Sequence, residues 1–169
     1  MTDQPCPYCM IVQGQLPTNK IYEDSNFIAA LEIRPANPGH VILFPKEHFK
    51  SILDMPANLA EEFLGLSARI AKSISKVSEG VTIIHSSGEA TSNVLEHLVT
   101  NIIPRFSGDN LTFAWNPKQI DEEQMKKLAE SISGAIESPE EKTPEVKEIQ
   151  DEEGPSYEEL EKQLPQRNS

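Results

Sequence analysis

The sequence predicts an α+β fold, in which an antiparallel sheet of about five strands packs against one long helix and one C-terminal helix. Two patterns carry this prediction. Short runs of β-branched and apolar residues are bounded by turn-forming residues, as in antiparallel strands. Two longer segments repeat their apolar residues every three or four positions, as amphipathic helices do. With 37% hydrophobic and 25% charged residues among 169, the composition is that of a globular protein and excludes collagen-like and wholly disordered classes.

The expected strands are short and are separated by turn-forming residues. Asp24-Ser25-Asn26 lies between the first two runs and predicts a hairpin, and a loop at 34–39, rich in proline, precedes the third run. Pro45 and Pro104 lack a backbone N–H and are expected to end the third and fifth strands. A loop with a brief helix is expected at 5–14. The expected strands are 21–23, 27–31, 40–44, 81–84, 94–103 and 111–115.

Two helices are expected from the spacing of apolar residues. The longer helix covers 56–77 and ends before Gly80. The second covers 121–136, where the acidic residues 121–123 suit the positive end of the helix dipole. The apolar face of the long helix consists of Leu59, Phe63, Leu66, Ile70, Ile74 and Val77, and that of the second consists of Met125, Leu128, Ile132 and Ile136.

The acidic charge of the chain is concentrated at its C-terminal end. The net charge at pH 7 is −12, of which residues 137–169 carry −7 and residues 1–136 carry −5. The final segment is rich in proline and poor in large apolar residues, so it predicts a disordered acidic tail after one folded domain at 1–136. The tail is expected to serve solubility, or to bind a partner through Tyr157, Leu160 and Leu164.

Charge and hydropathy also limit the partners and the location. The recognition of nucleic acid needs clustered Lys and Arg, so this acidic chain is not expected to bind it, although a local pocket can hold a small nucleotide. No apolar run approaches the length of a membrane span, so no membrane partner is expected. The N-terminus lacks the basic and apolar segments of a secretory signal, and the expected location is the cytoplasm.

The two cysteines of the chain form a Cys-Pro-Tyr-Cys motif at Cys6 and Cys9. A structural disulfide is disfavoured in a cytosolic protein. A redox pair resembles the glutaredoxin active site, but that chemistry needs a buried strand before the motif, and only five residues precede Cys6. A zinc half-site, which two distant histidines would complete, is the favoured interpretation.

Two longer segments carry a family resemblance. Residues 31–48 read LEIRPANPGHVILFPKEH and resemble the N-terminal signature of the histidine triad (HIT) superfamily. Residues 86–105 read SSGEATSNVLEHLVTNIIPR and fall where the second signature of that superfamily is expected. In the superfamily, that signature contains three alternating histidines. Trp115 and the Glu-rich helix after it add to a likeness that covers about residues 5–136. The resemblance implies a HIT-like fold.

The resemblance also implies a cofactor and an oligomeric state. One branch of the superfamily begins with Cys-Pro-x-Cys and closes a structural zinc site with the last histidine of the first signature and the first histidine of the triad. Homodimers are common in the superfamily, so the resemblance implies a homodimer as well. The four matching zinc ligands are Cys6, Cys9, His48 and His97.

The triad itself departs from the superfamily pattern. The superfamily's enzymes attack the α-phosphate of a nucleotide with the middle histidine, where this chain has Val99, whose isopropyl group has no lone pair. The third position holds Asn101, which can hydrogen-bond a phosphate but does not shuttle a proton near pH 7. His97 remains, and the resemblance assigns it to zinc. We therefore expect no catalytic residue at the triad positions 97, 99 and 101.

A weakened nucleotide pocket is still expected. Where the superfamily contacts phosphate, this chain has Ser92-Asn93 in place of Gly-Gln, and the ribose-contacting Asp is replaced by Glu32. Hydroxyl and amide groups still donate hydrogen bonds to a phosphate. The residues expected to contact a nucleotide are Glu32, His40, Ser86, Ser92, Asn93 and Asn101.

Three functions follow from these observations and stay open at this point. The first is a nucleotide-binding or scaffold protein without nucleotidyl-histidine catalysis, whose ligand is a purine nucleotide such as AMP. The second is a hydrolase or transferase of nucleoside phosphates or phosphoramidates, in which His40 or His85 serves as an unorthodox base. The third is a dimeric interaction module that works through the acidic tail.

Overall fold

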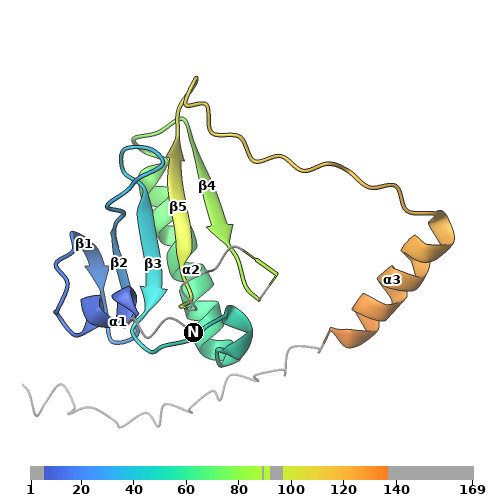
Figure 1. The fold of residues 1–169 in the computed structure, drawn as a ribbon, viewed down its shortest axis with the longest axis horizontal. Helices are drawn as coiled ribbons and strands as arrows, with labels where there is room; N and C mark the ends of the chain where they lie inside the picture. The colour runs from blue at the N-terminus through green and yellow to red at the C-terminus, as the bar shows by residue number, and fades with distance from the viewer. Residues whose placement is uncertain (1–5, 89, 92–96, 137–169) are drawn as a thin grey trace, which may run out of the picture. The chain divides into compact units, whose positions relative to one another are not determined.

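The structure, a computed structural model, describes residues 6–88, 90–91 and 97–136 (Figure 1). Contacts within the chain divide it into two compact units, Met1–Ala114 and Trp115–Ser169, and each is described by itself. The predicted boundary at residue 136 stays a prediction, and the predicted acidic tail lies outside the described residues.

The described strands form one antiparallel sheet in the first unit, as the sequence predicts, in the order β1-β2-β3-β5-β4. The β1–β2 hairpin turns at Asp24, whose carboxylate accepts the backbone N–H groups of Asn26 and Phe27 at 2.8 and 2.7 Å. β5 lies between β3 and β4 and pairs with both. The strands are β1 (Lys20–Glu23), β2 (Phe27–Leu31), β3 (Val41–Pro45), β4 (Gly80–His85) and β5 (Thr100–Arg105).

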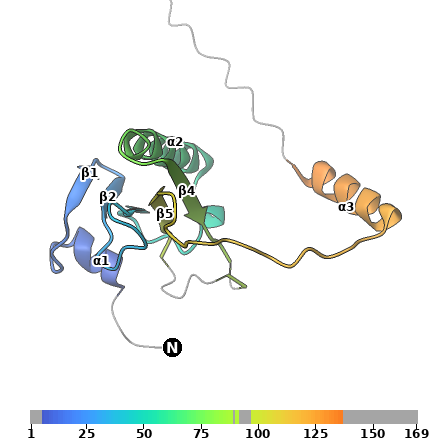
Figure 2. The same ribbon diagram turned by 90° about the horizontal axis from the view of Figure 1, so that it is seen from above.

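Helix α2 (Ala57–Ile74) covers one face of the sheet, as Figure 2 shows. Its apolar side chains recur every three or four residues, and the rings of Phe63 on α2 and Phe27 on β2 lie 5.4 Å apart. Each large apolar side chain contributes about 1.5–3 kcal/mol when fully buried. This face buries more such side chains than the opposite face, so it holds the main core. We call it the α2-side core; its buried residues are Phe27, Ala29, Val41, Leu43, Met55, Phe63, Leu66, Ile70, Ile74, Leu98 and Ile102.

A smaller apolar cluster covers the opposite face of the sheet. Successive side chains of a strand point to opposite faces, and the residues of β2 and β3 that turn away from α2 form this cluster. Helix α1 (Pro7–Val12) packs on it through Tyr8, Ile11 and Val12. We call its four buried residues the α1-side cluster: Ile28, Ala30, Ile42 and Phe44.

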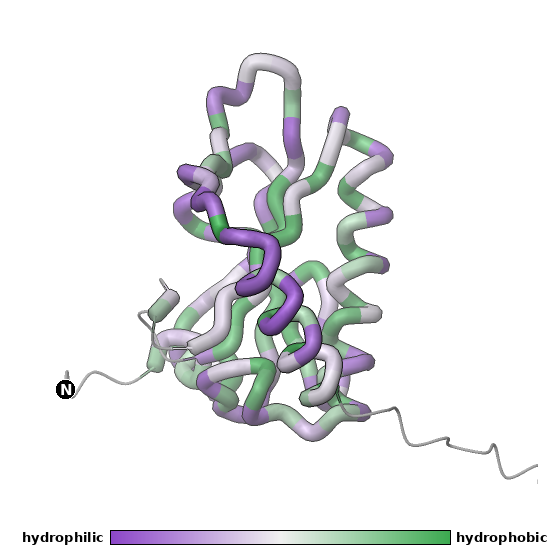
Figure 3. Tube along the Cα trace, turned by 90° about the vertical axis from the view of Figure 1, so that its right-hand side faces the viewer, coloured by the Kyte–Doolittle hydropathy of each residue, from purple (hydrophilic) through white to green (hydrophobic). Residues whose placement is uncertain are grey.

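Both predicted long helices are confirmed within a few residues. The first is α2 and the second is α3 (Glu122–Ala135), which Asp121 caps by accepting the backbone N–H of Gln124 at 2.9 Å. The hydropathy colouring of Figure 3 shows hydrophilic and hydrophobic residues alternating along the helices. Within the described part of the chain, no helix has the length and apolar character needed to cross a membrane.

Two strand predictions need correction. The strand expected at 94–103 is β5, which begins at Thr100 and continues through Pro104 to Arg105; residues 92–96 lie outside the described residues. The segment 111–115 forms no strand. Its composition favours extended backbone, but a strand also needs a neighbour to bond with, and the described sheet ends at β4 and β1.

Candidate functional site

Two cysteines and two histidines meet beside Phe44 of the α1-side cluster. Cys6 is the N-cap residue of α1, and Cys9 lies one turn later in that helix. His48 lies in the loop after β3, and His97 lies shortly before β5. The four potential ligand atoms all lie within 4.8 Å of one another. Residues far apart in the sequence therefore form one compact donor set.

His97 presents one particular nitrogen to this donor set. Its side chain is 0% exposed, and its Nε2–H donates to the carbonyl oxygen of Pro45 at 3.1 Å. Because Nε2 carries the proton, Nδ1 carries a lone pair and points at the other donors. Burial lowers the pKa of His97 from 6.5 to about 4; the Pro45 carbonyl opposes this shift and His48 reinforces it. The imidazole is neutral at pH 7, which is the form that binds a metal.

The spacing of the four donor atoms fits a tetrahedral zinc site. Zn–S bonds of about 2.3 Å and Zn–N bonds of about 2.0 Å place S and N ligands about 3.5 Å apart and two N ligands about 3.3 Å apart. The Sγ atoms of Cys6 and Cys9 lie 3.4 and 3.8 Å from His97 Nδ1. His48 Nδ1 lies 3.2 Å from both Cys9 Sγ and His97 Nδ1. Two sulfur and two nitrogen donors at these distances are the ligand set that structural Zn²⁺ prefers.

Tyr8 is a site residue that sequence reasoning missed. Its ring lies 5.2 Å from that of His97 and 5.0 Å from that of Phe44, so it covers the donor set from α1. Burial, and then the charge of Glu32, raise the pKa of its hydroxyl. Its place between the two cysteines was the available signal, since a helix that carries both ligands also carries this ring to the site.

The triad positions follow one another along one face of the chain. His97 contacts Phe44 of the α1-side cluster, and Val99 packs against the same cluster. Leu98, between them, belongs to the α2-side core on the opposite face. The middle triad position is therefore an aliphatic side chain with apolar neighbours, and it offers no nucleophilic atom.

Asn101, at the third triad position, is paired with His40. The backbone N–H of Ala36 donates to His40 Nδ1 at 3.2 Å, so the proton of the neutral ring is on Nε2, which donates to Asn101 Oδ1 at 3.0 Å. Burial lowers the pKa of His40, and the charge of Glu32 and the bond to Asn101 oppose that shift. Both ring nitrogens are engaged, and neither presents a free lone pair to a substrate.

Glycine at position 39 allows this arrangement. Gly39 has a φ of +86°, which other residues rarely adopt, and an added Cβ would lie 3.3 Å from the side chain of Pro104. The backbone turns there, directly before β3, and His40 then lies next to Asn101 of β5.

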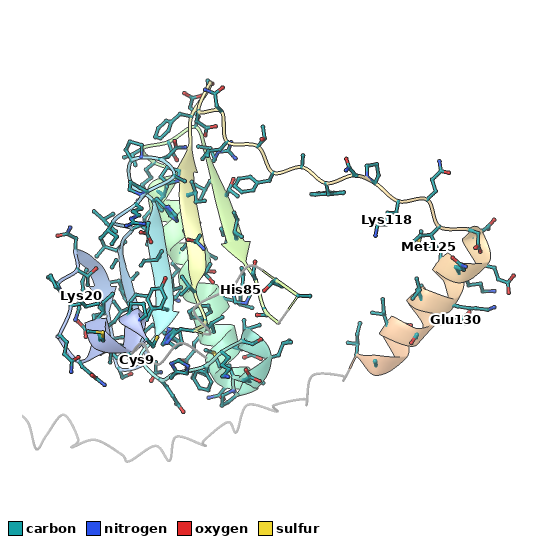
Figure 4. All side chains as sticks on the ribbon, in the orientation of Figure 1. Cys9, Lys20, His85, Lys118, Met125 and Glu130 are labelled. Atoms are coloured by element: carbon teal, nitrogen blue, oxygen red, sulfur yellow. The ribbon has the colours of Figure 1, made fainter. Side chains whose placement is uncertain are left out.

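His85 belongs to a different environment. Its Nδ1 and Nε2 atoms lie 3.0 Å from Thr100 Oγ1 and 2.9 Å from Ser87 Oγ, and its ring contacts that of Phe63 in α2. Burial lowers its pKa. Figure 4 shows His85 at the end of β4, apart from Cys9 on α1. The side chain links β4, β5 and the following loop on the α2 side of the sheet.

The remaining predicted nucleotide contacts are only partly described. Glu32 follows β2, its backbone N–H donates to the carbonyl of His40 at 2.9 Å, and its carboxylate acts electrostatically on both Tyr8 and His40. Ser86 directly follows β4. Ser92 and Asn93 lie outside the described residues. The structure thus gathers Glu32, His40 and Asn101 next to the α1-side cluster.

Comparison with known sequences gives a consistent result. The HIT domain model matches residues 13–108. An uncharacterized HIT-like protein of Borreliella burgdorferi is 31% identical over 133 residues, which cover 76% of this chain and 96% of that protein. The adenosine 5'-monophosphoramidase of Schizosaccharomyces pombe is 29% identical over 132 residues, which cover 78% of this chain and 98% of that enzyme.

Solved structures of HIT family proteins share the fold of this chain. A HIT family protein of Bacillus subtilis superposes with a TM-score of 0.73 at 25% identity, covering 80% of this chain and 100% of the other. A Zn-bound histidine triad family protein of Mycobacterium smegmatis gives a TM-score of 0.54 at 30% identity, covering 76% and 96%. The Cys2His2 donor set fits the zinc-binding branch. Since the HIT domain model matches more than half of its length, this chain belongs to the HIT family.

Proposed function

We propose that this protein binds a nucleoside monophosphate without forming the nucleotidyl-histidine intermediate of HIT enzymes. The packing of Val99 against the α1-side cluster carries this proposal. Nucleophilic attack on phosphorus needs an atom with a lone pair, and the resulting bond must break again at neutral pH. An isopropyl group among apolar neighbours meets neither condition.

The environments of the four histidines support the same conclusion. His40 uses one ring nitrogen for Ala36 and the other for Asn101, and both nitrogens of His85 lie within hydrogen-bond distance of hydroxyl groups. His48 and His97 belong to the Cys2His2 donor set. A histidine that took over the lost nucleophilic role would have to give up one of these contacts first.

Zinc is the structural cofactor in this proposal. Cys6, Cys9, His48 and His97 would hold it, and the fit of their spacing to a tetrahedron supports this assignment. Four protein ligands close the coordination sphere, so the metal would stabilise the fold rather than activate a substrate. It would tie α1 to the segments that follow β3 and precede β5.

The ligand that this proposal names is AMP, because the Schizosaccharomyces pombe relative is an adenosine 5'-monophosphoramidase. The carboxylate of Glu32 would accept hydrogen bonds from the ribose hydroxyls, and the His40–Asn101 pair lies beside it to contact the phosphate. The other proposed phosphate contacts are Ser86, Ser92 and Asn93.

Calorimetric titration of AMP into the zinc-loaded full chain tests the binding. We expect saturable heat, and we expect Glu32→Ala to weaken binding because it removes the ribose contact. Glu61→Ala is the matched control, since it removes an exposed carboxylate from α2 on the other face of the sheet. A folded, zinc-loaded protein that gives no heat would contradict the proposal, as would equal losses in the two variants.

The catalytic half of the proposal needs a separate assay. Incubation with an AMP phosphoramidate should give no nucleotidylated protein by intact mass, and hydrolysis should proceed at the buffer rate. Turnover that His40→Ala or His85→Ala abolishes would instead favour a hydrolase with altered catalytic residues. This outcome is distinguishable from weak binding because the calorimetric result stands independently.

A homodimer is part of the same proposal. Leu64 on α2 is 49% exposed, and on α3 Met125 and Ile132 are 54% and 62% exposed. Such apolar side chains favour burial against a second copy of the chain. Sedimentation at two protein concentrations should show a dimer; a monomer at both would remove this part of the proposal.

Removal of residues 137–169 would show whether a partner binds through the acidic tail.

A further inference from the structure

We propose that the Cys6–Cys9 pair makes the zinc site a redox switch, in which hydrogen peroxide joins the two thiolates as an intramolecular disulfide and the zinc ion leaves. This inference rests on the zinc site of the proposed function and adds a regulatory step to it. It differs from the glutaredoxin-like interpretation, because no second protein is reduced or oxidised.

The backbone geometry of the motif is compatible with a disulfide. Cys6 is the N-cap of α1, and its carbonyl already accepts the backbone N–H of Met10 at 3.1 Å, so residues 6–9 follow a helical turn. Residues three apart in a helix have Cα atoms about 5 Å apart, by its rise and radius, and disulfides span about 4.4–6.8 Å between Cα atoms. The two Sγ atoms lie within 4.8 Å. Side-chain rotation can bring them into bonding distance without moving the helix.

The cysteines also lie on the accessible side of the donor set. Cys6 and Cys9 are half-buried and His48 is exposed, whereas His97 is fully buried. The proposal therefore has the oxidant arrive, and the ion leave, on the side of Cys6, Cys9 and His48 rather than through the core around His97. The chain has two cysteines, so each thiol has a single intramolecular partner.

The reaction balances with peroxide as the oxidant. One thiolate attacks the O–O bond, becomes a sulfenic acid and releases hydroxide. The second thiolate attacks that sulfur, forms the S–S bond and releases a second hydroxide. Two protons from solvent convert the hydroxides to water. The two sulfur atoms together lose two electrons, peroxide gains them, and Zn²⁺ leaves with its charge unchanged because a disulfide is a poor ligand.

The experiment uses the full chain, reduced and loaded with zinc, and treats it with hydrogen peroxide. Released zinc is followed with a chromophoric chelator, free thiols are counted, and intact mass identifies the product. We expect the bound zinc and both free thiols to be lost together. The product should be lighter by two hydrogens than the reduced, zinc-free chain, and dithiothreitol should restore zinc binding. Cys9→Ser, which cannot form the intramolecular disulfide, should give no monomeric product lighter by two hydrogens; its Cys6 should instead stop at an oxidised form that has gained oxygen, or link two chains.

The outcomes separate this inference from the proposed function. A reduced chain that takes up no zinc would overturn the proposed zinc site and this inference together. A chain that binds zinc but keeps it under peroxide would overturn the switch alone. The switch also fails if zinc leaves while the sulfur atoms gain oxygen, or if the disulfide links two chains.

Discussion

One backbone carbonyl decides which atom of His97 is available to a metal. The Pro45 oxygen can only accept a hydrogen bond, so it fixes the proton on Nε2 and leaves the Nδ1 lone pair for the donor set. His40 has the same tautomer, with Nε2–H donating to Asn101, but there the backbone N–H of Ala36 donates to Nδ1 and occupies its lone pair. The Nδ1 lone pair is therefore available to a metal at His97 and not at His40.

The structure therefore predicts that His97 is essential for zinc binding. His97→Ala removes the buried ligand, and we expect zinc affinity to fall by more than about 100-fold, because even partners outside the coordination sphere account for about 10- to 100-fold. Competition with a chromophoric chelator measures the change. His85→Ala is the control, because its imidazole lies on the α2 side of the sheet, and its zinc affinity should be unchanged. Equal losses in the two variants would contradict the assignment.

Buried histidines also predict how the stability of the zinc-free protein depends on pH. Histidines in the unfolded chain titrate near pH 6.5, whereas burial lowers the pKa of His97 to about 4 and lowers those of His40 and His85. Between these values the unfolded chain binds more protons, so the free energy of unfolding falls as the pH falls from about 6.5 to about 4. Above about pH 6.5 this contribution is fully present.

Urea unfolding of the zinc-free chain at about pH 7.5 and about pH 5 measures this pH dependence. His97→Gln should flatten the dependence, since glutamine does not titrate. A zinc-free chain that is as stable at the lower pH as at the higher one would show that these histidines are not buried as described.

The sequence was sufficient to propose the four zinc ligands and to propose the loss of the nucleophile at Val99. Both inferences depend on residue types in a recognisable order. The tautomers of His97 and His40 could not be predicted from the sequence, because each is set by a backbone group that only folding brings close. Tyr8 was missed for a related reason: its contact with His97 joins residues almost ninety positions apart.

Among the elements, those with one clear periodicity were predicted well. The apolar positions of α2 and the hairpin of β1 and β2 follow patterns that single sequences reveal. Pro104 was expected to end its strand but lies within β5, paired with Val81. Its carbonyl accepts a hydrogen bond from the side-chain amide of Asn37 at 2.8 Å. Proline is tolerated in a strand where its missing N–H breaks no ladder bond, and whether a bond is needed at that position depends on the neighbouring strands.

Helix α1 gives a prediction at the scale of an element. It has six residues and no fully buried side chain, and helices this short are unstable alone. Removal of zinc with a chelator should therefore raise the hydrogen-exchange rates of residues 6–13 well above those of α2, which the α2-side core holds in place. Mass spectrometry of peptides from both helices measures the difference. Equal protection of α1 with and without zinc would show that its apolar contacts suffice.

At the scale of the whole molecule, the buried residues are concentrated in one of the two units. Every fully buried apolar residue among those described lies between Phe27 and Ile103, and α3 contains none. The Cys2His2 donor set and the described residues that are proposed to contact a nucleotide also belong to the first unit. The stability and the proposed binding function of the protein therefore depend on the same sheet, whose two faces carry the α2-side core and the α1-side cluster.

This distribution predicts that a chain ending at residue 114 folds and binds zinc. It retains the five described strands and both clusters, and the described residues after 114 add no buried side chain to either cluster. Urea unfolding at two protein concentrations separates folding from any effect of dimerisation. A chain ending at residue 99 is the control; it lacks β5, which bridges β3 and β4, and should not unfold cooperatively. If the chain ending at 114 behaves like this control, the second unit contributes to the stability of the first.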